Sequence, residues 1–141
     1  MSELERIVPD ASVILKWVLD AEDEPYLEEA NEILEGWKTR TLEVLVPSLW
    51  IYEVGNILCL KRPDDAEEIL GALRDLDLPE AVASEELTVE AVATSVGYGV
   101  TFYDASYLAV ARLNMATLVT ADVRFVEKLS EDAPVRLLAD L

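Results

Sequence analysis

Two spacings of apolar residues alternate along this chain, and they predict where its helices and strands lie. Apolar residues three or four positions apart mark amphipathic helices, whereas short continuous apolar runs mark buried strands. The helical spacing predicts helices over residues 12–19, 25–40, 48–60, 64–76, 84–96, 104–114 and 123–129. Asp10 or Ser12 is expected to cap the first helix and Ser48 the third, while Gly97 and Gly99 close the fifth.

The apolar runs between these helices predict the strands. Such runs cover residues 6–9, 44–46, 100–101, 117–120 and 135–138, and residues 78–84 leave a further short strand open. Strands and helices alternate with short connections, and no linker, repeat or low-complexity tract interrupts them. The pattern therefore predicts one α/β domain over residues 1–141, with a parallel sheet covered by helices.

The charge of the chain conflicts with simple nucleic-acid binding. Twenty-nine acids and eleven bases in 141 residues give a formal net charge of −18, whereas phosphate binding normally uses a basic face. One segment holds eight acids and no base: Asp20, Glu22, Asp23, Glu24, Glu28, Glu29, Glu32 and Glu35. We interpret that segment as a solvated helix surface. The acidity also suits a salt-rich surrounding or a basic partner, and the sequence does not choose between them.

Composition indicates a cytoplasmic protein with a packed core. Hydrophobic residues make up 52 % of the chain, yet no apolar stretch is long enough to cross a bilayer. Glu3 and Glu5 interrupt any signal segment at the start. The single cysteine, Cys59, permits no internal disulfide and fits a reducing compartment.

Three carboxylates follow predicted strands directly. Asp10, Asp104 and Asp122 each stand at the carboxyl end of an apolar run, and ligands of parallel sheets bind beyond these ends. An Asp between a strand and a helix is also a common helix cap, so each of them alone has that simpler interpretation.

Glu53 is a different case, because its predicted helix is otherwise almost without charge. A carboxylate on such a helix is unfavourable to bury unless it is paired or bound to a metal. Asn56 lies three residues later and shares its face. The simpler interpretations are one exposed position for Glu53 and a surface amide for Asn56.

If the four acids converge, they need a cation. Each pair of like charges at roughly 4–6 Å costs about 3–4 kcal/mol at an effective dielectric near 20. The chain has no histidine, so oxygen ligands would select Mg²⁺ or Mn²⁺. No glycine-rich phosphate loop is present, which argues against a nucleotide cofactor. Metal-activated water and phosphodiester hydrolysis remain as the chemistry. An aspartyl nucleophile at Asp10 is disfavoured, because Ser12 stands where a second Asp is usual.

Four segments together resemble the PIN-domain family, particularly VapC-type toxins of toxin–antitoxin pairs. They are Pro9-Asp-Ala-Ser-Val-Ile-Leu-Lys-Trp17, Val46-Pro-Ser-Leu-Trp-Ile-Tyr-Glu-Val-Gly-Asn56, Thr101-Phe-Tyr-Asp-Ala-Ser-Tyr-Leu-Ala-Val-Ala111 and Leu118-Val-Thr-Ala-Asp122. The resemblance implies a PIN-like three-layer α/β/α fold, with a parallel sheet of four or five strands. It also implies a Mg²⁺- or Mn²⁺-dependent endoribonuclease.

The resemblance carries over to particular residues. It implies catalytic and metal-binding roles for Asp10, Glu53, Asp104 and Asp122, and supporting roles for Ser12, Asn56 and Thr120. Local capping is the alternative for Ser12 and Thr120. Few bases are left for RNA. The plausible candidates are Lys16, Lys61, Arg62, Arg112 and Arg124, and a surface charge is the simpler interpretation of each.

Partners follow from the same resemblance. It implies an RNA substrate, a cognate antitoxin whose tail reaches the acidic groove, and a homodimer that Trp50 and Ile51 could serve. The alternative function, suggested by the net charge of −18, is a catalytically silent PIN-like module that binds a basic partner protein.

Overall fold

A parallel four-stranded sheet forms the centre of the computed structural model, which describes residues 4–19 and 24–141. The strand order is β2-β1-β5-β6, and Val8 of β1 lies opposite Leu118 of β5. The strands are β1 (Arg6–Pro9), β2 (Glu43–Val44), β5 (Thr117–Thr120) and β6 (Val135–Leu137). The two central strands are continuous apolar runs because both of their faces are covered. The predicted α/β fold with a parallel sheet is confirmed.

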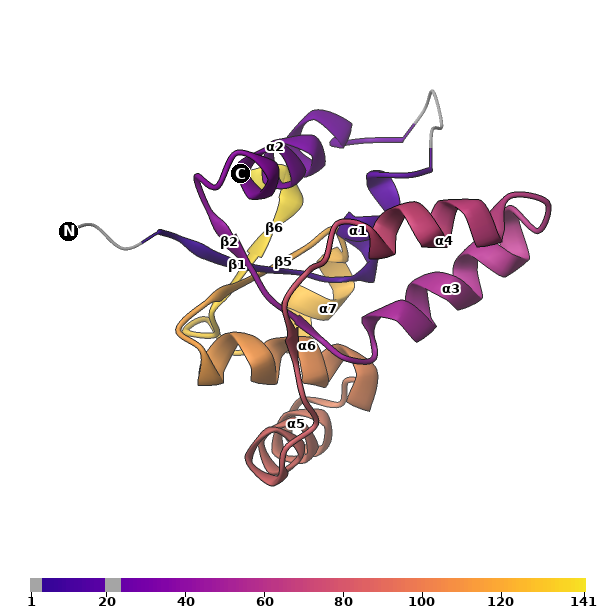
Figure 1. Ribbon diagram of the computed structural model, residues 1–141. Helices are drawn as coiled ribbons and strands as arrows, with labels where there is room; N and C mark the ends of the chain where they lie inside the picture. Colours follow the sequence, from indigo (N-terminus) through magenta and orange to yellow (C-terminus); the bar gives the residue numbers. More distant parts are fainter. Residues whose placement is uncertain (1–3, 20–23) are drawn as a thin grey trace.

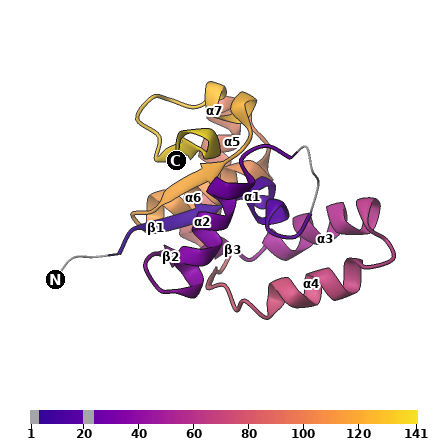
Figure 2. The same cartoon turned by 90° about the horizontal axis from the view of Figure 1, so that it is seen from above.

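Helices cover both faces of this sheet (Figure 1). They are α1 (Ala11–Lys16), α2 (Leu27–Lys38), α3 (Trp50–Lys61), α4 (Ala66–Arg74), α5 (Glu85–Tyr98), α6 (Phe102–Leu113) and α7 (Val123–Lys128), followed by the 3₁₀ helix η1 (Leu138–Asp140). The helix α2 lies on one side, and α5 and α6 lie on the other. Figure 2 shows α3 and α4 as a hairpin that extends from one end of the sheet. No helix in the described ranges is long and apolar enough to cross a membrane.

The helix α6 is the most deeply buried helix of the fold. Residues 105–111 are all buried, and α6 packs against β1, β3 and β5 while α5 covers its outer side. Small residues at Ala105 and Ala109 let the helix approach the strands closely. This packing holds the first turn of α6, which carries Asp104, firmly against the core.

The predicted strand at residues 44–46 is in fact two strands in two sheets. The Leu45 amide donates to the Ile7 carbonyl at 3.1 Å, but the next amide, of Val46, donates to the Pro79 carbonyl at 3.0 Å. The strand β3 (Val46–Pro47) therefore pairs in parallel with β4 (Glu80–Ala81) in a separate two-stranded sheet. The short strand that the sequence left open within residues 78–84 is β4.

Two predicted helix starts were wrong. Residues 100–101 form no strand, because the Thr101 hydroxyl accepts from the Asp104 amide at 3.0 Å and caps α6, which begins at Phe102. Asp104 is thus in the first turn of a helix and not at a strand end. Ser48 does not cap α3 either, since Leu49 takes the N-cap position without a side-chain bond.

Trp50 is a core residue of its own chain. Its side chain is 3 % exposed, and its Nε1 donates to Glu80 Oε2 at 2.7 Å. It therefore offers no free surface for a dimer, contrary to the sequence-based suggestion. Ile51 is half-buried and also packs against the core.

Candidate functional site

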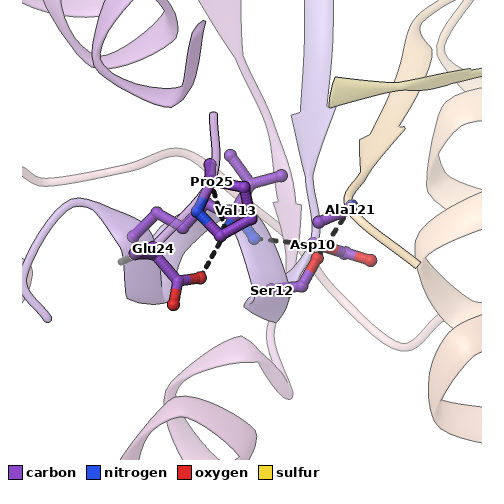
Figure 3. Close-up of polar contacts among 7 residues, drawn as sticks. Asp10, Ser12, Val13, Glu24, Pro25 and Ala121 are labelled. Atoms are coloured by element: carbon purple, nitrogen blue, oxygen red, sulfur yellow. Dashed lines mark hydrogen bonds and ion pairs between the residues drawn. The ribbon is translucent and has the colours of Figure 1, made fainter. Parts of the chain in front are cut away.

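Asp10 is held at the carboxyl end of β1 by a network that reaches the neighbouring strand. Its Oδ1 accepts from the Ser12 hydroxyl at 2.5 Å and from the Val13 amide at 3.3 Å, which caps α1. The Ser12 hydroxyl in turn accepts from the Ala121 amide at 3.0 Å (Figure 3). Asp10 is therefore a helix cap and also a fixed carboxylate at the sheet end.

Asp122 and Thr120 lie beside it, at the end of β5. The buried Thr120 hydroxyl accepts from the Asp122 amide at 3.1 Å and is close enough to Asp10 to lower its pKa. Asp122 Oδ1 accepts from the Phe125 amide at 3.1 Å and caps α7, while the residue stays exposed. One threonine hydroxyl thus stands between two acids of neighbouring strands.

Glu53 and Asp104 reach the same region from the first turns of α3 and α6. The charge of Asp104 raises the pKa values of Asp10 and Glu53, that of Asp10 raises the pKa of Glu53, and that of Asp122 raises the pKa of Asp104. The four acids named from the sequence therefore act on one another electrostatically, although four different helices carry or follow them.

Burial is the main cause of the raised pKa values. It raises the pKa of Asp10 from 3.8 to about 6, against the hydrogen bonds from Ser12, Thr120 and Val13, which lower it. Burial also raises the pKa values of Glu53 and Asp104. Crowded, partly desolvated carboxylates either take up protons or bind a cation.

The four carboxylates have the chemistry of ligands for a hard cation, but they do not surround a common point. All four candidate ligands are carboxylates, which suits Mg²⁺ or Mn²⁺. Glu53 Oε1 is also buried without a hydrogen-bond partner. However, within the described ranges no three His, Cys, Asp or Glu side chains are grouped so that they could hold a metal ion. The carboxylates would have to turn towards a common point to ligate it.

The proposed supporting residue Asn56 and the proposed RNA contacts have varied surroundings. Asn56 is exposed on α3. Lys16 is almost buried, and its Nζ donates to Glu24 and to the Pro25 carbonyl (Figure 3). Arg112 donates to Glu90 Oε1 at 3.1 Å and to Thr94 Oγ1 at 3.2 Å. Arg124 and Lys61 are exposed, and Arg62 pairs with Asp65. Contact with RNA stays a prediction for each of these bases.

Sequence reasoning assigned no role to Tyr107, which lies beside Glu53. Its side chain is 1 % exposed, and its hydroxyl is near enough to Glu53 to lower the pKa of that carboxyl. The contact nevertheless falls outside hydrogen-bond geometry, so Tyr107 Oη and Glu53 Oε1 both lack a partner. The available signal was its position three residues after Asp104, on the same helix face.

A groove adjoins the acids. Its volume is about 300 Å³, and it lies between α1 and α3, lined by Ser12, Leu15, Lys16, Leu19, Glu24, Ile57, Lys61 and Ala121. A wider cavity of about 740 Å³ lies elsewhere, between the start of α3 and the segment from Arg74 to Glu80, and includes none of the four acids. None of the four acids lines the smaller groove either, but its lining includes Ser12, whose hydroxyl donates to Asp10.

The cap that Asp122 provides can be separated from any chemical role. Asp122→Ala should destabilise the protein by about 1 kcal/mol through loss of the bond to the Phe125 amide. Asp122→Asn should keep that bond and most of the stability. Urea denaturation of both variants measures the difference, and equal midpoints would show that the cap contributes nothing.

Comparison with known proteins places the chain among others of its fold. A family model for the PIN domain matches residues 7–128. No curated protein matches the sequence.

Several solved structures resemble this one over nearly its whole length. A toxin–antitoxin complex from Klebsiella pneumoniae contains a chain that is 18 % identical with a TM-score of 0.69, covering 94 % of this chain and 97 % of that one. PAE2754 from Pyrobaculum aerophilum is 27 % identical with a TM-score of 0.63, covering 97 % and 91 %. Mycobacterium tuberculosis VapC20, a sarcin-ricin loop cleaving toxin, is 18 % identical with a TM-score of 0.65, covering 91 % and 99 %.

Proposed function

This chain belongs to the PIN domain family, and we propose that it is a metal-dependent endoribonuclease acting as the toxin of a VapC-type toxin–antitoxin pair. The observation that carries the proposal is the set of charge interactions among Asp10, Glu53 and Asp104, to which Asp122 is joined through Asp104. Such an arrangement is unfavourable in an ordinary domain surface and favourable where a divalent cation binds. The choice of an RNA substrate follows by analogy of fold with VapC20, a sarcin-ricin loop cleaving toxin.

The four acids would hold Mg²⁺ or Mn²⁺, and the other residues would orient them. When bound, the ion would lower the pKa of a water molecule and neutralise charge on the scissile phosphate. Ser12 and Val13 hold the Asp10 carboxylate in place through their bonds to Oδ1. Thr120 lies between Asp10 and Asp122, because its hydroxyl accepts from the Asp122 amide and lowers the pKa of Asp10.

The groove beside Ser12 would receive the substrate and the antitoxin tail in turn. It combines the apolar side chains of Leu19 and Ile57 with the exposed Lys61. A basic residue on the antitoxin tail would complement the acids and exclude the ion. If the protein is an RNA-cleaving toxin, it would act in the cytoplasm, and its residues 1–141 would form a single nuclease domain. A homodimer belongs to the same proposal, with an interface that does not use the buried Trp50.

Cleavage of RNA by the pure protein tests this function. We expect cleavage with Mn²⁺ or Mg²⁺, none after chelation with EDTA, and a fall to the chelated level in Asp104→Asn. Asp132→Asn is the matched control, because it removes the same charge from an exposed position in the turn after α7. Activity that survives both EDTA and Asp104→Asn would contradict the proposal.

The same preparation distinguishes the alternative function. A catalytically silent module would cleave no RNA and would bind no Mn²⁺ in calorimetry. It would instead retain a basic partner protein through its charge of −18. Mn²⁺ binding that is lost in Asp104→Asn would exclude it.

A further inference from the structure

Two buried oxygen atoms without partners belong to side chains that interact at the candidate site. Among all buried side-chain nitrogen and oxygen atoms of the described residues, only Glu53 Oε1 and Tyr107 Oη lack a hydrogen bond. They come from different helices, α3 and α6, and they interact with each other. Buried polar groups are nearly always paired, and leaving one unpaired is destabilising. Two such atoms side by side indicate a bond that forms in another state of the site.

Glu53 is the acid that most needs an orienting partner. Asp10 is held by Ser12 and Val13, Asp122 is held by the Phe125 amide, and Thr101 interacts with Asp104. Glu53 has the longest side chain of the four, and among the described residues the hydroxyl that lowers the pKa of its carboxyl is that of Tyr107. The tyrosine ring is fixed by the core around α6, so its hydroxyl has a defined position.

We propose that Tyr107 is the positioning residue of Glu53, and that its hydroxyl donates to Oε1 when the carboxylate turns to bind the ion. The bond leaves the other carboxylate oxygen facing the ion and fixes the rotamer of a flexible side chain. Partners of this kind, which orient a ligand without touching the metal, commonly change metal affinity by about 10- to 100-fold. The inference rests on the proposed metal-dependent function.

A simpler interpretation is that Tyr107 only fills space in the core. Phenylalanine would fill the same space without placing an unpaired hydroxyl there. The two interpretations therefore predict opposite results for Tyr107→Phe, which removes a single oxygen and keeps the ring. If Tyr107 orients Glu53, metal binding weakens while the metal-free fold is as stable as before or more stable. If the hydroxyl instead stabilises the fold, Tyr107→Phe lowers the stability of the metal-free protein.

Calorimetric titration with Mn²⁺ and thermal melting of the metal-free protein test the proposal together. We expect Tyr107→Phe to bind Mn²⁺ at least about tenfold more weakly, with no fall in melting temperature. Tyr26→Phe is the matched control, because Tyr26 is exposed before α2 and should change neither quantity. In a Glu53→Gln background the effect of Tyr107→Phe should vanish, because the hydroxyl acts through that carboxylate.

Each other outcome has a separate meaning. If the unaltered protein binds no Mn²⁺, the proposed function fails and the role of Tyr107 fails with it. If the unaltered protein binds and Tyr107→Phe binds equally well, only the positioning role is overturned. A lower melting temperature in Tyr107→Phe, or an effect that persists with Glu53→Gln, also overturns it. A Tyr107→Phe variant that does not fold counts as the same overturning result, because the hydroxyl would then be structural.

Discussion

Replacing Asp10 by Asn should stabilise the metal-free protein at about pH 7.5 by up to about 3 kcal/mol, although Asp10 is central to the proposed site. The reason is that burial raises the pKa of Asp10 from 3.8 to about 6, so its ionised form is disfavoured in the folded state. The difference between these values corresponds to about 3 kcal/mol. Asn should keep the acceptor for Ser12 and Val13, and its amide could donate to Thr120.

The pH dependence of this gain follows from the direction of the pKa change. Below pH 3.8 Asp10 is protonated in the folded and the unfolded chain, so its charge destabilises neither. Between pH 3.8 and about pH 6, Asp10 is ionised in the unfolded chain but still protonated in the folded one, so stability falls as the pH rises. Above about pH 6, Asp10 is ionised in the folded state as well, and its buried charge destabilises that state in full. The advantage of Asp10→Asn should therefore be absent near pH 3, small near pH 4 and complete near neutrality.

Urea denaturation at several pH values, in EDTA, measures this gain. Asp132→Asn is the control, because it removes one carboxylate from an exposed position and reduces the net negative charge equally. If both variants are stabilised alike at about pH 7.5, the gain comes from net charge and not from the burial of Asp10. A variant that is stabilised but inactive would show that the site is maintained at the expense of stability.

The elements of the fold were predictable where local pattern decides them. The strand β5 (Thr117–Thr120) was predicted with its observed bounds, because a continuous apolar run between polar residues has few alternatives. The strands β2 and β3 were not separable, because their division depends on whether an amide reaches Ile7 or Pro79, and that choice is made by distant segments. At Thr101 a β-branched residue favours a strand locally, but its hydroxyl caps α6 instead.

The candidate site was predictable in its acids and not in what surrounds them. Asp10 and Asp122 stand out in sequence because helix caps and strand ends are local features, and Glu53 stands out because its helix has few other charges. Asp104 was selected on the expectation of a strand end, whereas it lies in the first turn of α6. Tyr107 does not stand out, because a tyrosine among apolar residues is an ordinary core position and its neighbour Glu53 is far away in sequence. Lys16 was named as a candidate RNA contact or a surface charge, but it is buried and pairs with Glu24 of the acid-rich segment.

The second large effect is expected from metal itself. At a Mn²⁺ concentration about 100 times the dissociation constant, binding to the folded state alone should stabilise the protein by about 2.7 kcal/mol. For a chain of this length that corresponds to a rise in melting temperature of roughly 10 °C. Because Asp10, Glu53 and Asp104 have raised pKa values, protons compete with the ion. The rise should be small at about pH 5 and full at about pH 8.

Two controls are needed because the chain carries a net charge of −18, and any salt stabilises such a protein by screening its self-repulsion. The comparison is therefore made against NaCl of equal ionic strength. Screening would raise the melting temperatures of Asp10→Asn and Asp132→Asn alike, whereas binding at the site should be weakened only in Asp10→Asn. If Mn²⁺ gives no more stability than NaCl at about pH 8, the carboxylates do not form a cation site. Their raised pKa values would then reflect burial in a domain whose acids bind protons instead.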